Sequence, residues 1–181
     1  MIILSLHWPI AAILFAANLI YVTIRFKTER SRKIKWILIG LYSVLLVKFV
    51  VFPIVLGGRF PQELYWDNIL QLIPFNSIRK YVKFGTWPIQ MLGNIGLLAP
   101  FAAMTYFYSN FGWKKRISWC ILFPFLIEGT QLTVDLLTRY PCHVVDIDDV
   151  ILNLAGEFLL LVIVRWAEKS NLLKKYSQSK G

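Results

Sequence analysis

Residues 117–137 read ISWCILFPFLIEGTQLTVDLL, an apolar stretch with a row of polar side chains in its second half. About 20 helical residues are enough to cross the hydrocarbon core of a bilayer, which is about 30 Å thick. Glu128, Gln131 and Asp135 follow the spacing i, i+3, i+7, so they share one face of such a helix. The stretch therefore predicts a membrane-spanning helix with a polar face.

Further apolar stretches occupy about residues 4–24, 36–56, 87–108 and 150–166, and the last of them is the shortest. Of the 181 residues, 57% are hydrophobic and only 17% are charged, more apolar side chains than a soluble domain of this size can bury. Lipid cannot satisfy an open backbone, which leaves helices as the spanning elements. We predict an all-α polytopic membrane protein, with residues 1–181 forming a single integral membrane domain of about five transmembrane helices.

The cations predict the orientation of the chain. Fourteen of the 20 Lys and Arg residues fall in 25–35, 114–116 and 165–180, which lie on one side if there are five spans. The positive-inside rule makes this side cytoplasmic and places the N-terminus outside and the C-terminus in the cytoplasm. Tryptophans near the predicted span ends agree with an interfacial belt: Trp8, Trp36, Trp66, Trp87, Trp113, Trp119 and Trp166. The net charge of +10 is thus a topology signal, and nucleic acid is not an expected partner.

The predicted outer segment, residues 57–86, is too long for a simple connecting loop. Its apolar run around Leu70 is too short to span a bilayer. Residues 78–84 instead fit a short interfacial helix with apolar side chains towards lipid. We expect this re-entrant or interfacial segment to cover a polar pocket.

Ionisable side chains inside spans are rare and by default suggest function. Lys48, Glu128 and Glu157 all fall roughly 10–14 Å below the predicted outer boundary, at about 1.5 Å per residue. They occupy one layer, which predicts a buried ion pair of Lys48 with Glu128 or Glu157. The alternative is that the pair only holds helices together.

Polar residues of three spans predict a pocket that opens towards the outer face. Asp146, Asp149 and Asn153 continue at the helical spacing of one stripe. The predicted ligand-binding residues are Asn94, Glu128, Gln131, Arg139, Asp146, Asp149 and Asn153. Candidates for catalysis are Glu128, Asp146, Asp149 and His143, of which His143 is the better group for titrating chemistry.

The three acids in residues 146–149 allow two interpretations. Carboxylates at a helix start cap free N–H groups, which explains one or two of them. Clustered carboxylates also suit a divalent cation, so Asp146, Asp148 and Asp149 are weak metal candidates. The set lacks further ligands, and we expect no cofactor.

Four segments together resemble the VanZ-like family of membrane proteins over about residues 65–160. NILQLIPF, from Asn68 to Phe75, is followed by an isoleucine at position 78, and NIGLLAPF runs from Asn94 to Phe101. Glu128 and Gln131 match the family's E-x-x-Q pair, and DIDDVILNLAG, from Asp146 to Gly156, matches its D-x-x-D-x-x-x-N-x-x-G signature. Each motif alone is weak, whereas all four in order are fairly specific.

The resemblance implies a bacterial cell-membrane protein, and it implies a link to resistance against the lipoglycopeptide teicoplanin. Two positions depart from the family pattern. His143 stands where the family often has arginine, with Arg139 one helical turn earlier, and Phe101 replaces a glycine after the proline of the third span. At these positions the chain therefore lacks the guanidinium and the glycine of the family pattern.

Three hypotheses for the function follow. The first is an envelope-resistance factor that binds a lipoglycopeptide or a cell-wall lipid carrier in an outer-leaflet pocket, with membrane lipids around it. The second is an intramembrane enzyme that modifies a lipid or polyprenyl head group, with Glu128 as general acid or base. The third is a helical scaffold whose polar layer only fixes packing. The sequence leaves open whether the chain is an enzyme.

Overall fold

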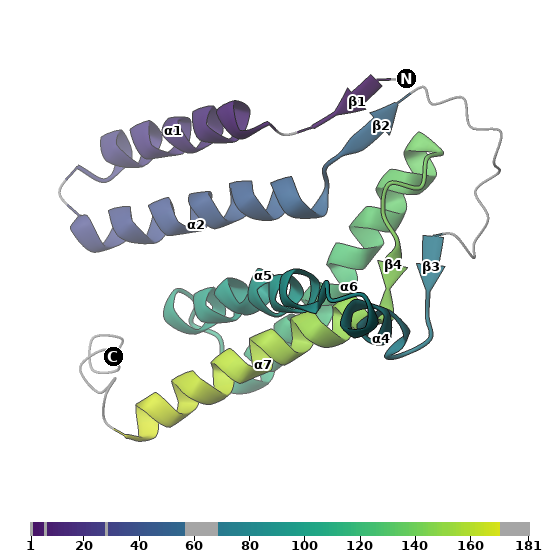
Figure 1. Cartoon of the computed structure of the whole chain (residues 1–181). Helices are drawn as coiled ribbons and strands as arrows, with labels where there is room; N and C mark the ends of the chain where they lie inside the picture. Colours follow the sequence, from purple (N-terminus) through teal and green to yellow (C-terminus); the bar gives the residue numbers. More distant parts are fainter. Residues whose placement is uncertain (1, 6, 28, 57–68, 171–181) are drawn as a thin grey trace. The chain divides into compact units, whose positions relative to one another are not determined.

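The computed structural model describes residues 2–5, 7–27, 29–56 and 69–170, and this part of the chain is mostly helical (Figure 1). Its six helices are α1 (Trp8–Arg25), α2 (Arg30–Val50), α4 (Asn76–Lys83), α5 (Trp87–Phe107), α6 (Trp113–Thr138) and α7 (Ile147–Lys169). A helix thus occupies most of each of the five predicted spans, and α4 falls on the predicted short helix. Trp66, Asn68 and the rest of 57–68 lie outside the described residues.

Two of the described helices, α1 and α6, are long and apolar enough to cross a membrane by length and composition. The prediction that α2, α5 and α7 also cross it stays a prediction. The fifth span was expected to be the shortest, but α7 has 23 residues, which is about 34 Å of helix. It extends beyond its apolar stretch because Asp148 and Asp149 occupy its first turn, where carboxylates complement the helix dipole.

The purely helical prediction is wrong at the ends of the first two spans. Strand β1 (Ile2–Leu4) pairs antiparallel with β2 (Ile54–Leu56), with Ile3 opposite Val55. Helix α2 ends at Val50 because Pro53, just beyond, has no backbone N–H to continue it. The β-branched residues that follow favour a strand. At its other end α2 begins earlier than predicted, at Arg30, because Arg and Lys are good helix formers.

A second small sheet joins two stretches that are far apart in the sequence. Strand β3 (Leu70–Gln71) runs parallel to β4 (Val145–Asp146), with Gln71 opposite Asp146 (Figure 1). The residues just before α4 and just before α7 are therefore hydrogen-bonded to each other. This pairing was not predicted.

Internal contacts divide the chain into two compact units, each made of two sequence segments. The first unit comprises residues 1–74 and 125–147, and the second comprises 75–124 and 148–181. The boundary crosses α6 directly after Pro124, through which the helix continues. The single integral membrane domain stays a prediction.

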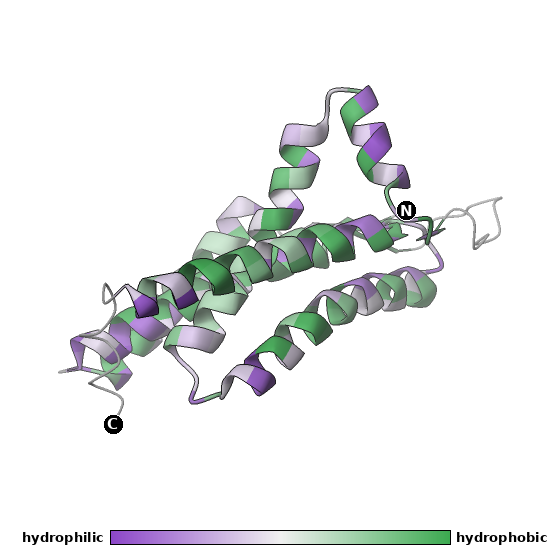
Figure 2. Ribbon diagram, turned by 90° about the horizontal axis from the view of Figure 1, so that it is seen from below, coloured by the Kyte–Doolittle hydropathy of each residue, from purple (hydrophilic) through white to green (hydrophobic). Residues whose placement is uncertain are grey.

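Large apolar side chains are exposed along the helices of both units. In α1, Ile13, Ile20 and Ile24 are exposed, and in α6 Leu137 is 80% exposed. Figure 2 shows in green how apolar residues recur along the helices. Exposed apolar side chains of this kind are typical of helices that face lipid.

Each unit contains one close helix contact at a glycine. In the first unit, Gly40 of α2 lies against the side chain of Asn18 in α1. In the second unit, Gly156 of α7 lies against the backbone carbonyl of Ile95 in α5. A small residue is what permits two helix backbones to approach this closely.

Candidate functional site

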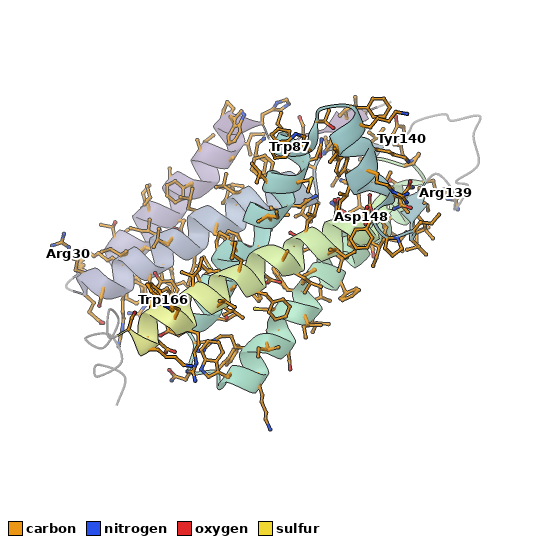
Figure 3. The ribbon with its side chains drawn as sticks, turned by 60° about the horizontal axis from the view of Figure 1, so that its bottom comes forward. Arg30, Trp87, Arg139, Tyr140, Asp148 and Trp166 are labelled. Carbon is orange, nitrogen blue, oxygen red and sulfur yellow. The ribbon has the colours of Figure 1, made fainter. Side chains whose placement is uncertain are left out.

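The end of α6 folds back on itself around Asp135, in the first unit. The backbone N–H of Tyr140 donates to the carbonyl of Asp135 at 3.2 Å, which is the six-to-one bond of a Schellman motif. Arg139 supplies the left-handed residue of this motif, with φ 52° (Figure 3 labels Arg139 and Tyr140). Glycine usually fills this position, because a side chain there costs about 1–2 kcal/mol.

The carboxylate of Asp135 fixes the position of His143. Its two oxygens accept the backbone N–H groups of Cys142 at 3.2 Å and of His143 at 2.9 Å. The Nδ1 atom of the His143 ring lies 2.9 Å from Asp135 Oδ1. Asp135 thus closes the turn and at the same time orients the imidazole.

The second nitrogen of this imidazole is buried without a partner. The His143 side chain is only 10% exposed, and among the described residues its Nε2 atom has no hydrogen-bond partner. A buried polar atom left in this way costs about 1–3 kcal/mol. A histidine held by a carboxylate through one nitrogen, with the other one available, can donate to or accept from a bound molecule.

Cys142, next to His143, is a poor nucleophile. Burial raises the pKa of its thiol above the ordinary value, and the nearby Asp135 carboxylate raises the pKa further. A hydrogen bond from the backbone of Val55 opposes these effects in part. Because only the thiolate is reactive, Cys142 is not an activated cysteine.

Glu128 and Asp146 lie in the same unit as His143 and are both buried. The Oε2 atom of Glu128 accepts the backbone N–H of Asp146 at 3.0 Å, which ties α6 to β4. Gln71 of β3 approaches the Asp146 carboxylate at 3.5 Å. Gln131, one turn after Glu128, donates to the carbonyl of Val50 at 3.2 Å. The predicted E-x-x-Q pair therefore connects α6 to two other segments of the first unit.

Asp148 is a helix cap in the second unit. It is fully buried, and its oxygens accept the backbone N–H groups of Phe75 at 2.5 Å, Ser77 at 2.8 Å and Ile78 at 3.0 Å. These are donors at the start of α4 that the helix itself cannot satisfy. Asp148 therefore caps α4, whereas the capping interpretation of the acids predicted a cap on their own helix.

The other signature residues of the second unit lie along α7. Asn94 of α5 donates from Nδ2 to Asp149 Oδ1 at 2.5 Å. Asn153 and Glu157, one turn apart, are buried. Asn153 Oδ1 has no hydrogen-bond partner among the described residues, and Glu157 lies against the Cys120 thiol. The Asn94–Asp149 contact brings two predicted ligand-binding residues together.

The three acids of residues 146–149 have three different hydrogen-bond partners. Asp146 meets Gln71, Asp148 caps α4 and Asp149 accepts from Asn94. Within the described part of the chain, no three His, Cys, Asp or Glu side chains gather as a metal ion would require.

Two further predicted residues are placed as follows. The Lys48 ammonium lies 4.4 Å from the centre of the Trp8 ring, a cation–π contact within the first unit. Its predicted ion pair with Glu128 or Glu157 stays a prediction; Glu128 belongs to the same unit as Lys48, and Glu157 belongs to the other. Arg139 is exposed at the end of α6.

The sequence of the chain matches a known protein family. The VanZ/LLP1 family model matches residues 39–168 of the chain. The chain belongs to the VanZ/LLP1 family. No curated protein and no solved structure matches it.

The VanZ/LLP1 match includes α5, α6 and α7 and extends further towards the N-terminus than the predicted region, into α2. It makes the chain a membrane protein, as the sequence indicated. Sequence reasoning noted Asp135 on the polar face of α6 but did not include it in the site. The sequence contains a signal for this contact, because Asp135 and His143 are eight residues apart and Pro141 between them ends the helical pattern.

Proposed function

We propose that the chain is a bacterial cell-membrane protein that binds the polar head of an amphiphilic envelope ligand. The ligand would be a lipid-tailed glycopeptide such as teicoplanin, or a lipid carrier of cell-wall units. The observation that carries this proposal is the buried, unpartnered Nε2 of His143, held in place by Asp135. A ligand hydroxyl, amide or phosphate would satisfy this atom.

The surroundings of His143 suit an amphiphile. Leu136 and Leu137, at the same end of α6, are exposed apolar side chains against which a lipid tail could pack. Such burial contributes about 0.8 kcal/mol per CH₂ group. The predicted contacts of the first unit are Glu128, Gln131, Arg139 and Asp146; those of the second unit, Asn94, Asp149 and Asn153, also stay predictions.

His143→Leu is expected to weaken binding of teicoplanin to the purified full-length protein about 10- to 100-fold. The change removes one hydrogen bond to a polar or charged head group, worth about 1.5–3 kcal/mol. Asp135→Asn is expected to weaken binding too, because it disturbs the orientation of the ring. Binding is measured by isothermal titration in detergent, and resistance is measured in cells that express each variant.

Cys142→Ser is the matched control, because it lies in the same turn and keeps the imidazole. It should bind as the parent does. If His143→Leu stays folded and binds teicoplanin as tightly as the parent, the proposal is wrong. If His143→Leu and Asp135→Asn lower the thermal stability but leave binding unchanged, the contact between Asp135 and His143 only stabilises the fold.

The Asp135–His143 geometry also favours the second candidate, an enzyme acting on a lipid or polyprenyl head group. A carboxylate that orients an imidazole is the arrangement of a general base, which accepts a proton from a hydroxyl or water at Nε2. A comparison of lipid extracts from cells with the parent and with His143→Leu separates the two candidates. A lipid species that changes between the two favours the enzyme, and unchanged lipids favour the binder.

We further propose that the N-terminus lies outside the plasma membrane and the C-terminus in the cytoplasm. The cations near α1–α2, α5–α6 and the end of α7 support this orientation. Fusion of green fluorescent protein to the C-terminus should give fluorescent cells, and alkaline phosphatase fused there should be inactive. An active C-terminal phosphatase would show that the C-terminus lies outside, contrary to the proposed orientation.

A further inference from the structure

A groove lies between the beginning of α6 and the end of α7, within the second unit. Its volume is about 370 Å³, and its walls are almost entirely apolar. The lining residues are Trp113, Ile117, Phe158, Leu161, Val162, Arg165, Trp166 and Lys169. None of the predicted or observed residues of the His143 site is among them.

Cations surround one end of this groove. Arg165 and Lys169 line it directly, and Lys114 and Lys115 occupy the first turn of α6. The guanidinium of Arg165 lies 5.0 Å from the centre of the Trp113 ring, which holds it at the groove. Glu168, to which Arg165 donates at 3.2 Å, also accepts a hydrogen bond from the Tyr106 hydroxyl. Glu168 thus offsets part of this positive charge.

The buried Arg116 stabilises this end of the unit from within. Its guanidinium donates to the carbonyls of Thr105 at 3.1 Å and Phe111 at 3.0 Å, and it stacks on Trp113 at 4.9 Å. Trp113 thus contacts two guanidinium groups, which restrict its orientation. The aromatic wall of the groove is therefore held in place by contacts within the second unit.

We infer that the groove binds an anionic phospholipid, with an acyl chain against Phe158, Leu161 and Val162 and the phosphate at Arg165 and Lys169. Apolar walls with cations at one end are complementary to a lipid with a negative head group. Tryptophans at the rim, such as the exposed Trp166 (Figure 3), are suited to the boundary between head groups and tails. In the proposed orientation this end faces the cytoplasmic leaflet, where a juxtamembrane cation attracts anionic lipids.

The experiment is native mass spectrometry of the full-length protein from nanodiscs that contain equal amounts of phosphatidylglycerol and phosphatidylcholine. The parent is expected to retain phosphatidylglycerol preferentially. The double variant Arg165→Gln/Lys169→Gln should reduce that preference about 25-fold, since each of the two cations near the surface contributes about a factor of five. Val162→Trp, which fills the groove and keeps every charge, should lower retention of either lipid at this site.

Lys33→Gln/Lys35→Gln is the matched control, because it removes two cations from α2 on the same predicted side of the membrane. This control should retain phosphatidylglycerol as the parent does, and so should His143→Leu, whose effect concerns only the proposed function. The inference is overturned if the two double variants lose the same amount of lipid, because the attraction would then be general. It is also overturned if Val162→Trp leaves lipid retention unchanged. A third contrary result is that Val162→Trp or Arg165→Gln/Lys169→Gln converts a dimer to a monomer, because a second copy of the chain would then fill the groove.

Discussion

Asp148→Ala is expected to lower the free energy of unfolding by about 3–6 kcal/mol. The change leaves the backbone N–H groups of Phe75, Ser77 and Ile78 without their acceptor. An unsatisfied buried donor such as that of Ser77 costs about 1–3 kcal/mol, and each of the two part-buried donors adds less. Asp148 is fully buried, so water does not readily replace the carboxylate. Unfolding of the purified protein by SDS, followed by circular dichroism, measures the loss.

Asp148→Asn is the matched control for this prediction. Asparagine keeps the shape and one acceptor oxygen, but its NH₂ group faces donors where the second carboxylate oxygen was. We expect about half of the loss seen with alanine. An alanine variant as stable as the parent would mean that the start of α4 finds other acceptors, and the cap would have no energetic importance.

Gly156→Ala is expected to be the second large effect. A Cβ atom at this position would overlap the backbone carbonyl of Ile95, which cannot rotate away as a flexible side chain can. Helices α5 and α7 must then separate, and overpacking of this kind costs about 3 kcal/mol. A lower melting temperature in detergent and a smaller yield of folded protein are the measurements.

Gly96→Ala provides a control one residue away from Ile95. A Cβ atom at Gly96 would meet no other atom within 4 Å, so only helix propensity changes. Alanine is favoured over glycine in a helix by about 1 kcal/mol, and Gly96→Ala should be neutral or slightly stabilising. If Gly156→Ala has as little effect on the melting temperature as Gly96→Ala, helices α5 and α7 do not pack closely at Gly156.

The helices were predictable because their signal is local. A run of about 20 apolar residues identifies a helix from its own composition, and α5 begins and ends within one residue of the predicted stretch. The errors occur where a neighbouring segment determines the structure. Strands β1 and β2 stabilise each other, and neither has a signal strong enough to predict the pairing alone.

The site was predictable in its residue types but not in its partners. The spacing placed Glu128, Gln131 and Asp135 on one face, whereas the acceptors and donors that they meet come from other segments. Asp148 illustrates the limit, because the N–H groups that it accepts are about 70 residues away in the sequence. No periodicity within 146–156 distinguishes the aspartate that caps α4 from the one that meets Asn94.

The pairing of β3 with β4 bears on the order in which the protein is assembled. Strand β3 and helix α4 leave the ribosome about 70 residues before β4 and Asp148, the groups that complete their hydrogen bonds. Helices α1 and α2, in contrast, adjoin in the sequence and can pack during synthesis. The segment before α5 therefore lacks these hydrogen-bond partners until β4 and the start of α7 have been synthesised.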